Sequence, residues 1–390
     1  MVRITTNGTL FNYRYNLSKN TNSLNNAMMK VMTGRNFGSY AADPAAATRA
    51  FKIHSSLNAT NAQYSNNQTV TSKYEAAWSN LKGILDDLSN DLGQVPALGG
   101  LNGTNLDDLD TQAQVLRAGA DAIIQSLNSK YDNAYIFAGS DNKEAPFAIN
   151  DAGFITYRGI EIDNPDTINA EYIDPQTGKT VDKTDENGNI VYETDEDGNL
   201  VYDNAGKPIP EKLTNADVLK QWAEDDPLYV DIGLGFELDE NGNVIDSTAF
   251  DAAISGIDIM GYGLDDDGDP KNMASLMLRL ADVFEGYDPD SKTWTNGTEE
   301  DANRLVNKFL DSKEAVIDKH SELASEAEFL DTNSTQLESN FDALNTELNS
   351  IEQADPVDAI TELVWAQTCY SAALQVGVNV IPQSLMDYLK

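Results

Sequence analysis

Residues 10–34 carry apolar side chains at a heptad spacing. The apolar residues that recur every seven positions, or three positions later, are Leu10, Tyr13, Leu17, Leu24, Ala27 and Val31. This spacing places them in one stripe along a helix. Because a single stripe cannot build a core, the helix is expected to pair with another helix.

The last segment of the chain, which starts at Asp355-Pro356, repeats this pattern. One row consists of Val357, Val364, Ser371, Val378 and Leu385, and its companion row of Ile360, Gln367, Leu374, Ile381 and Tyr388. We expect the two terminal helices to lie side by side and to bury their stripes against each other. Two helices still expose apolar surface, so the remainder is predicted to contact other subunits. The predicted subunit-interface residues are Leu10, Tyr13, Leu17, Leu24, Val31, Val357, Ile360, Val364, Leu374, Val378, Ile381 and Leu385.

Helical patterns also occupy much of the chain between the termini. Asp43-Pro44 is typical of a helix start, with Asp as the N-cap and Pro at the first helical position. The pattern that follows predicts a helix toward residue 92, a turn over 93–103 that holds Pro96 and several glycines, and a helix over 106–127. Residues 273–286 and 300–351 are helical by the same criterion.

From about residue 135 to residue 263 the periodicity changes. Short β-rich runs lie at 154–157, 190–192 and 200–202, bounded by Asn-Gly and Asp-Gly pairs that favour hairpins. A ten-residue near-repeat places 184–192 beside 194–202 in sequence, and residues 238–244 resemble it. We interpret this stretch as a β-rich inserted domain.

The predicted fold class is α+β: an elongated rod of long, coiled-coil-like helices with paired N- and C-terminal segments and an inserted β-rich outer domain. The predicted division is an inner N-terminal coiled-coil segment at 1–42, the N-terminal half of the helical rod at 43–134, and the outer domain at 135–270. The C-terminal half of the rod follows at 271–352 and an inner C-terminal coiled-coil segment at 353–390.

Charge narrows the classes of partner. The 390 residues carry a formal charge of −38, which disfavours nucleic acid and anionic membranes. Residues 1–80 hold eight bases and two acids, so this acid-poor segment is at +6 and the remaining chain at −44. The N-terminus lacks the apolar region of a secretory signal, which leaves a cytoplasmic protein or export without a cleaved signal.

Candidate chemistry is sparse. The single cysteine, Cys369, excludes a disulfide within the chain and a thiolate-rich metal site. No phosphate-binding loop, His-Glu-x-x-His helix or Gly-x-Ser-x-Gly turn occurs. We therefore predict no enzyme activity, no cofactor and no metal.

The acidic turns are the candidate for an ion site in this sequence. Asp265, Asp267 and Asp269 alternate like calcium ligands, as do Asp185, Asn187 and Asn189. An EF-hand loop needs glycine at position six and glutamate at position twelve, whereas glycine stands at position four of these turns. Solvated hairpin turns are favoured, and a weak ion site is the alternative.

Two motifs at opposite ends of the chain carry a family resemblance. Residues 24–35, which end in Thr33-Gly34-Arg35, lead to Ala42-Asp43-Pro44; residues 358–363, 370–374 and 384–389 lie at the other end. Together they resemble the bacterial flagellin superfamily over roughly residues 1–145 and 300–390. The resemblance implies helical terminal and rod domains, a variable outer domain, and export in unfolded form through the flagellar type III apparatus.

Two roles within the superfamily fit different segments. Residues 134–147 and Tyr157-Arg158-Gly159 are similar to members that form the junction between hook and filament. Ile381-Pro382-Gln383 is similar to filament-forming flagellins. The resemblance thus implies a structural, self-assembling protein of the extracellular flagellum. Its implied partners are copies of itself in a ring or helical assembly, a neighbouring hook-associated protein, flagellin and an export chaperone. An acidic calcium-dependent secreted adhesin or enzyme is the alternative from another class.

Overall fold

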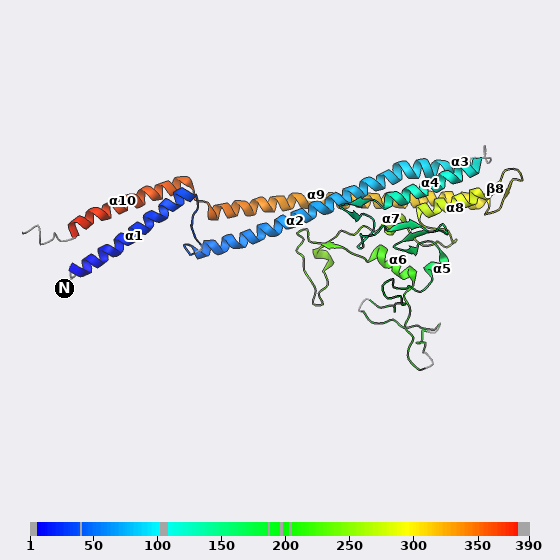
Figure 1. Cartoon of the computed structure of the whole chain (residues 1–390), viewed down its shortest axis with the longest axis horizontal. Helices are drawn as coiled ribbons and strands as arrows, with labels where there is room; N and C mark the ends of the chain where they lie inside the picture. The colour runs from blue at the N-terminus through cyan, green and yellow to red at the C-terminus, as the bar shows by residue number, and fades with distance from the viewer. Residues whose placement is uncertain are drawn as a thin grey trace, which may run out of the picture. The chain divides into compact units, whose positions relative to one another are not determined.

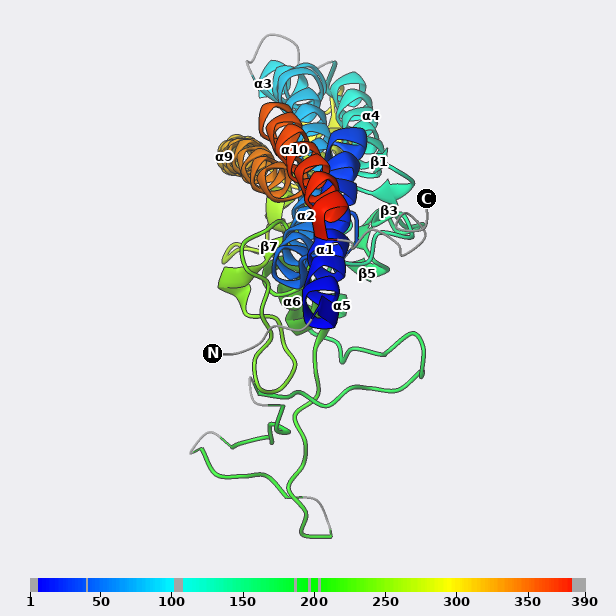
Figure 2. The ribbon, with the colours of Figure 1, turned by 90° about the vertical axis from the view of Figure 1, so that its left-hand side faces the viewer.

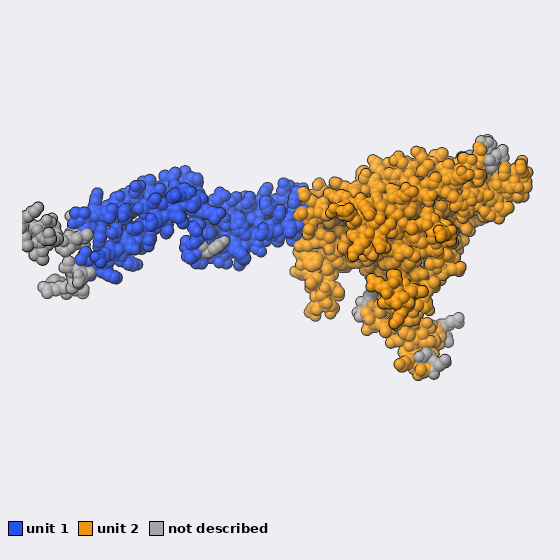
Figure 3. Space-filling view, viewed as in Figure 1, with its two compact units in different colours: residues 1–64, 335–390 blue, residues 65–334 orange. Residues whose placement is uncertain are grey.

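The structure is a computed structural model that describes residues 6–39, 41–101, 108–185, 188–195, 198–202 and 205–380. The chain forms two compact units, Met1–Tyr64 with Thr335–Lys390 (unit 1) and Ser65–Ser334 (unit 2), shown in Figure 3. Long helices together with small antiparallel sheets confirm the predicted α+β class. The five predicted segments and their boundaries stay a prediction.

The helices account for most of the two units (Figure 1). They are α1 (Thr6–Thr33), α2 (Pro44–Gly83), the π-helix η1 (Ile84–Gln94), α3 (Val95–Leu101), α4 (Leu109–Leu127), α5 (Pro165–Ile168), α6 (Asn215–Glu224), the 3-10 turn η3 (Asp246–Thr248), α7 (Gly256–Met260), α8 (Met273–Glu285), α9 (Glu299–Glu352) and α10 (Pro356–Val380). The predicted helices at the N-terminus, after Asp43, and over 273–286 and 300–351 are confirmed, and the predicted C-terminal helix is confirmed as far as Val380; residues 381–390 lie outside the described part.

Two aspartates start helices as the sequence predicted. The Asp43 carboxylate accepts hydrogen bonds from the amides of Ala45 and Ala46, at 3.1 and 3.0 Å. The Asp355 carboxylate accepts from Val357 at 2.7 Å. Each carboxylate satisfies amides that the first turn of a helix leaves free, which fixes where α2 and α10 begin.

Unit 1 consists of two helix pairs. Helices α1 and α10 lie side by side (Figure 1). The first part of α2 packs against the last part of α9, with Ala50, Ile53, Leu57 and Leu348 in a small buried cluster. Gly34, in the left-handed region at φ 67°, ends α1, and its carbonyl accepts a hydrogen bond from the Ala354 amide at 2.9 Å. This bond ties the chain after α1 to the chain before α10.

Unit 2 holds the main hydrophobic core. Helices α4 and α8 pack along one another, and Leu116, Ile123 and Phe284 between them have no exposed surface. The Arg117 guanidinium on α4 bonds Asp282 and Glu285 on α8, at 2.5 and 2.8 Å.

The predicted turn at 93–103 is wrong over the residues that the structure describes. Helix α2 passes into η1, and α3 follows directly. Pro96 explains the wide turn, because a proline ring inside an α-helix clashes with the carbonyl four residues earlier. In the π-helix each amide bonds the carbonyl five residues earlier, as Val95 does with Asn90, and the chain continues helically past the proline. Residues 102–107 lie outside the described part.

The strands of unit 2 are short. They are β1 (Lys130–Tyr131), β2 (Ala134–Tyr135), β3 (Phe147–Ile149), β4 (Ile155–Tyr157), β5 (Ile160–Glu161), β6 (Tyr229–Val230), β7 (Phe250–Asp251), β8 (Tyr287–Asp288) and β9 (Thr293–Trp294). All pairs are antiparallel, and the three-stranded sheet has the order β3-β4-β5. The predicted strand at 154–157 corresponds to β4. The predicted runs at 190–192 and 200–202 form single bridges instead of extended ladders.

Candidate assembly surface

Helix α1 turns its predicted stripe toward α10. Leu10, Tyr13, Leu17 and Leu24 are half-buried, and Ala27 is fully buried. Val31, at the end of the same row, is exposed. The heptad spacing therefore marks the face that α1 uses within its own chain.

Helix α10 meets α1 with a row of mostly small residues that the sequence interpretation passed over. The row recurs at alternating steps of four and three, and consists of Ala359, Leu363, Ala366, Tyr370, Ala373 and Gly377. A Cβ added to Gly377 would clash with the Tyr13 side chain. Alanine and glycine at this spacing let two helix backbones approach closely. The spacing of these small residues is visible in the sequence, but a search for rows of large apolar residues does not find it.

The two large apolar rows predicted on α10 lie on the outside of the helix pair. Val357, Ile360, Val364, Leu374 and Val378 are all exposed; Val357 is 72% exposed and Val378 79%. Trp365, next to them, is 70% exposed. Ile381 and Leu385 lie outside the described residues. We call Val357, Ile360, Val364, Trp365, Leu374 and Val378 the outer face of α10.

Helix α1 adds exposed apolar side chains to unit 1. They are Phe11, Tyr15, Met28, Met29, Val31 and Met32. Exposed apolar side chains that gather on one element mark interaction sites more often than single ones do. The exposed apolar side chains of α1 and α10 can bind other apolar helices.

Charge on this helix pair is unequal along its length. Residues 363–380 carry no charged side chain, and the charged residues of α1 are Arg14, Lys19 and Lys30. Lys30 bonds Glu362 at 2.7 Å, between the end of α1 and the start of α10. The other end of the pair is thus apolar and weakly basic, in a chain that is otherwise strongly acidic.

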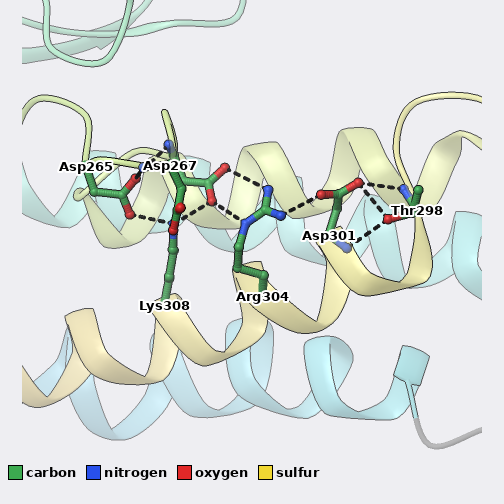
Figure 4. Close-up of polar contacts among 7 residues, drawn as sticks. Asp265, Asp267, Thr298, Asp301, Arg304 and Lys308 are labelled. Carbon is green, nitrogen blue, oxygen red and sulfur yellow. Dashed lines mark hydrogen bonds and ion pairs between the residues drawn. The ribbon is translucent and has the colours of Figure 1, made fainter.

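The acidic turn at residues 265–269 is the one cluster, among the described residues, whose carboxylates come close enough to hold a metal ion. The Lys308 ammonium already lies among them, 2.6 Å from Asp265, 2.9 Å from Asp267 and 2.7 Å from Asp269 (Figure 4). Arg304 bonds Asp269 at 2.8 Å. The protein's own cations therefore already lie against these carboxylates and offset part of their charge.

The same contacts shift the pKa of Asp269. Burial alone would raise this pKa, but the hydrogen bonds from Arg304 and Lys308 outweigh burial and hold it below its usual range. Arg304 also bonds Asp301, which caps α9 through a reciprocal pair of bonds with Thr298 (Figure 4). The turn is thus fastened to the first turns of α9.

The exposed acidic turns share the backbone geometry of this cluster. The Asp185 carboxylate accepts a bond from the Asn189 amide at 2.8 Å, and Asp239 accepts from Asn243 at 2.8 Å. Asp265 accepts from the Asp269 amide in the same way, at 3.0 Å. These carboxylates close hairpin turns. The turns at Asp185 and Asp239 are exposed, as the solvated-turn interpretation predicted, whereas Asp269 is buried and paired with Arg304 and Lys308, so that interpretation is wrong for Asp269. Calcium binding stays an untested alternative.

No described helix is long and apolar enough to cross a lipid bilayer.

Comparison with known proteins identifies part of the chain. Residues 4–142 match the bacterial flagellin N-terminal helical region. The predicted resemblance to the flagellin superfamily is confirmed over residues 4–142, and the resemblance of residues 300–390 stays a prediction. A search of curated proteins finds no match.

Solved flagellar proteins are similar to this chain at low identity. A flagellar hook-associated protein from Vibrio parahaemolyticus shares 14% identity over 80% of this chain and 100% of its own, with a TM-score of 0.49. Flagellar hook-associated protein 3 from Legionella pneumophila shares 16% over 77% and 98%, with a TM-score of 0.42. FlgL from Xanthomonas campestris shares 16% over 76% and 99%, with a TM-score of 0.40.

Proposed function

We propose that this chain, whose residues 4–142 match the flagellin N-terminal helical region, is a structural protein of the bacterial flagellum at the junction between hook and filament. It self-assembles in a ring or helical array through its terminal helices. It catalyses no reaction and needs no cofactor. Its place is the extracellular flagellum, which it reaches by export in unfolded form with a chaperone.

The outer face of α10 carries this proposal. The six large apolar side chains of the outer face are exposed, and so is Val376 on the same helix, while the row that starts at Ala359 is already used by α1. Burying one Val, Leu or Ile side chain contributes about 1.5–3 kcal/mol. Neighbouring subunits that cover this face would gain that contribution several times over.

The predicted interface residues divide into two roles under this proposal. Leu10, Tyr13, Leu17 and Leu24 hold α1 against α10, and so they shape the surface without forming most of it. Val31 and the outer face of α10 make the contacts with neighbouring subunits. Those neighbours are further copies of the chain, an adjoining hook-associated protein and flagellin.

The junction role rests on residues 134–147, whose sequence is similar to junction members of the superfamily. Phe137 and Phe147 of this segment are fully buried in unit 2, and the Asn128 side chain bonds both the amide and the carbonyl of Phe147, at 3.0 and 2.7 Å. The segment is therefore fixed within the core of unit 2 by the side chains of its own aromatic residues. A filament-forming flagellin remains the second candidate, because Ile381-Pro382-Gln383 is similar to flagellins.

A triple variant of the outer face tests the assembly surface. Val357→Ser, Val364→Ser and Val378→Ser together replace exposed isopropyl groups with smaller, polar hydroxymethyl groups, so the chain should fold with unchanged helix content by circular dichroism. In a strain that lacks the wild-type chain, this variant should fail to enter isolated hook–filament structures and should not restore swimming.

A matched variant provides the control. Ile173→Ser, Leu200→Ser and Leu238→Ser remove three exposed apolar side chains of unit 2, and this variant should assemble and restore swimming. Normal assembly of the outer-face variant would contradict the proposed surface.

The strain without the chain separates junction from filament. Loss of a junction protein should leave hooks on the cell and release unassembled flagellin into the medium. If the purified chain instead extends filament seeds into long filaments, it is a flagellin.

A further inference from the structure

Residues 171–214 leave the helices of unit 2 and return to them, drawn in green in Figure 2. The outgoing part holds the near-repeat 184–193 and 194–203. Each repeat makes the same turn: Asp185 accepts the Asn189 amide at 2.8 Å, and Asp195 accepts the Asn199 amide at 2.8 Å. The repeat in sequence is therefore a repeat in structure.

The backbone of this segment closes into rings of three hydrogen bonds. The Lys183 amide donates to the Glu211 carbonyl at 2.8 Å, the Glu211 amide to the Val191 carbonyl at 2.9 Å, and the Val191 amide to the Lys183 carbonyl at 2.8 Å. Three strands thus meet at one level, each donating one bond and accepting one bond. We call such a ring a layer.

A second layer repeats the first. The Glu193 amide donates to Ile209 at 2.9 Å, the Ile209 amide to Val201 at 3.0 Å, and the Val201 amide to Glu193 at 2.9 Å. Ten residues separate Lys183 from Glu193, and ten separate Val191 from Val201. Two residues separate Glu211 from Ile209 on the return strand. One layer therefore uses ten outgoing residues and two returning ones.

The return strand has a sequence suited to this rule. Ile209 and Glu211 donate their amides within layers, whereas Pro208 and Pro210, which alternate with them in sequence, have no amide to donate. Proline is excluded from positions that must donate in a sheet and is tolerated at the alternate ones. Proline therefore alternates with the residues that donate within layers, and it stands where no layer bond needs an amide.

The base of the stack is joined to the hydrophobic core of unit 2 and to α6. The Tyr172 amide donates to Leu213 at 2.7 Å, and the Leu213 amide to Val181 at 2.8 Å. Tyr172 and Leu213 also pack against the core. Lys183 bonds Asp217 on α6 at 3.0 Å. Above this base, hydrogen bonds hold the segment without a core, since none of the described residues of 171–214 is buried.

We propose that residues 171–214 are a repeat-built spacer, in which each ten-residue unit, matched by two residues of the return strand, adds one layer and moves the tip outward. Two extended residues span about 7 Å, so one layer sets a step of about 7 Å. The spacer determines how far its tip stands from α6. This spacer would act in the same way whatever the role of the terminal helices.

A matched insertion tests the rule in the full chain. One variant receives a second copy of residues 184–193 after Glu193, together with a second copy of Pro208-Ile209 after Ile209. Spin labels at Leu200→Cys and Lys220→Cys, in a Cys369→Ser background, report the distance from the upper layer to α6. The mean distance should rise by about 7 Å with a distribution as narrow as that of the parent.

The unmatched insertion is the control. It adds the ten residues without Pro208-Ile209, so the return strand is two residues short and the distance distribution should broaden. Removing 184–193 together with Pro208-Ile209 should shorten the mean distance by about 7 Å. The proposal is overturned if matched and unmatched insertions give the same distribution, or if the matched changes leave the distance where it was.

Discussion

Two helix pairs in this molecule have similar contacts between their helices, but the surfaces that face away from those contacts differ in burial. In unit 2, α4 and α8 approach at Gly119, where an added Cβ would lie 2.5 Å from Met277 and 2.8 Å from Leu92. In unit 1, α1 and α10 approach at Gly377. Both pairs use a glycine for close contact, so the contact itself does not distinguish them.

The difference lies on the sides that face away from the contact. Along α8, the residues from Met273 to Met277 are all buried, because other elements of unit 2 cover that helix. Along α10, among the described residues, Ala359, Ala366 and Gly377 are the buried ones, and the large side chains of the outer face are exposed. Unit 2 completes its own core, whereas unit 1 leaves half of an apolar helix for something else to cover.

The largest expected effect comes from removing a buried side chain in unit 2. Leu116→Ala should lower the free energy of unfolding by about 2–5 kcal/mol, because Leu116 is fully buried and the cavity cannot be filled by solvent. Val364→Ala, an exposed truncation in unit 1, should change it by less than about 0.5 kcal/mol.

Tryptophan placement allows the two units to be read separately in this test. Trp78, Trp222 and Trp294 belong to unit 2, and Trp365 to unit 1. In a Trp365→Phe background, fluorescence during urea unfolding reports on unit 2 and measures Leu116→Ala. Circular dichroism, which follows the helices of both units, measures Val364→Ala in the parent chain. A large loss of stability for Val364→Ala of the isolated chain would show that the outer face of α10 is packed within the monomer, contrary to the comparison.

The sequence predicted the helices that local signals define. Asp43 and Asp355 start helices through their own side chains, and the heptads of α1 extend over several turns, so neighbours along the chain contain the information. Pro96 was misread because proline usually ends a helix, and the π-helix that accommodates it has no simple sequence signal.

The candidate surface was predicted only in part. The apolar rows on α10 were found, but which of its faces meets α1 was not, because size and apolarity favour Val364 over Ala366. Packing favours the smaller residue, since it allows close approach. The attachment of Asp269 to Lys308 could not be predicted either, because 39 residues separate them and no local pattern pairs a turn with a later helix.

Alanine at Gly119 and at Gly377 compares the two helix contacts directly. Gly119→Ala should destabilise unit 2 by about 1–3 kcal/mol, because the new methyl group meets Leu92, including its backbone carbonyl at 3.0 Å. Gly377→Ala should cost less, because Tyr13 is half-exposed and can turn away. Thermal unfolding by calorimetry measures both. Equal losses would mean that the α1–α10 pair is as tightly constrained as the core of unit 2.

The third prediction concerns pH and contrasts two carboxyls of unit 2. The pKa of Asp269 is lowered in the folded chain: burial opposes ionisation, but Arg304 and Lys308 favour it more. Asp269 therefore contributes stability above its unfolded pKa of about 3.9, and this contribution is lost as pH falls through the lowered value. Asp269→Asn should reduce stability at pH 7 and flatten the loss in acid.

Glu326 should behave in the opposite way. Burial, with Glu322 nearby, raises its pKa, so its charged form weakens the fold and stability rises as pH falls through the raised pKa. Glu326→Gln should remove this rise. Urea unfolding from pH 3 to 8 tests both variants, with Asp239→Asn in an exposed turn as the control. For each variant, the difference in unfolding free energy from the parent is plotted against pH. Slopes of the same sign for Asp269→Asn and Glu326→Gln would contradict the opposite pKa shifts of these two carboxyls.

The smallest expected effect is that of the charged contacts across each helix pair. Lys30 and Glu362 join α1 to α10 through one partly exposed bond, and a double-mutant cycle should give a coupling of about 0.2–1 kcal/mol. Arg117 joins α4 to α8 through two carboxylates, so its cycle with Glu285 should give a value toward the upper end of that range. Both couplings should shrink in 1 M salt, where the screening length is about 3 Å. A coupling for Lys30 and Glu362 well above 1 kcal/mol that persists in salt would mean that charge, and not the small-residue row, holds α1 on α10. The outer face of α10 would then lose its fixed orientation whenever that one bond broke.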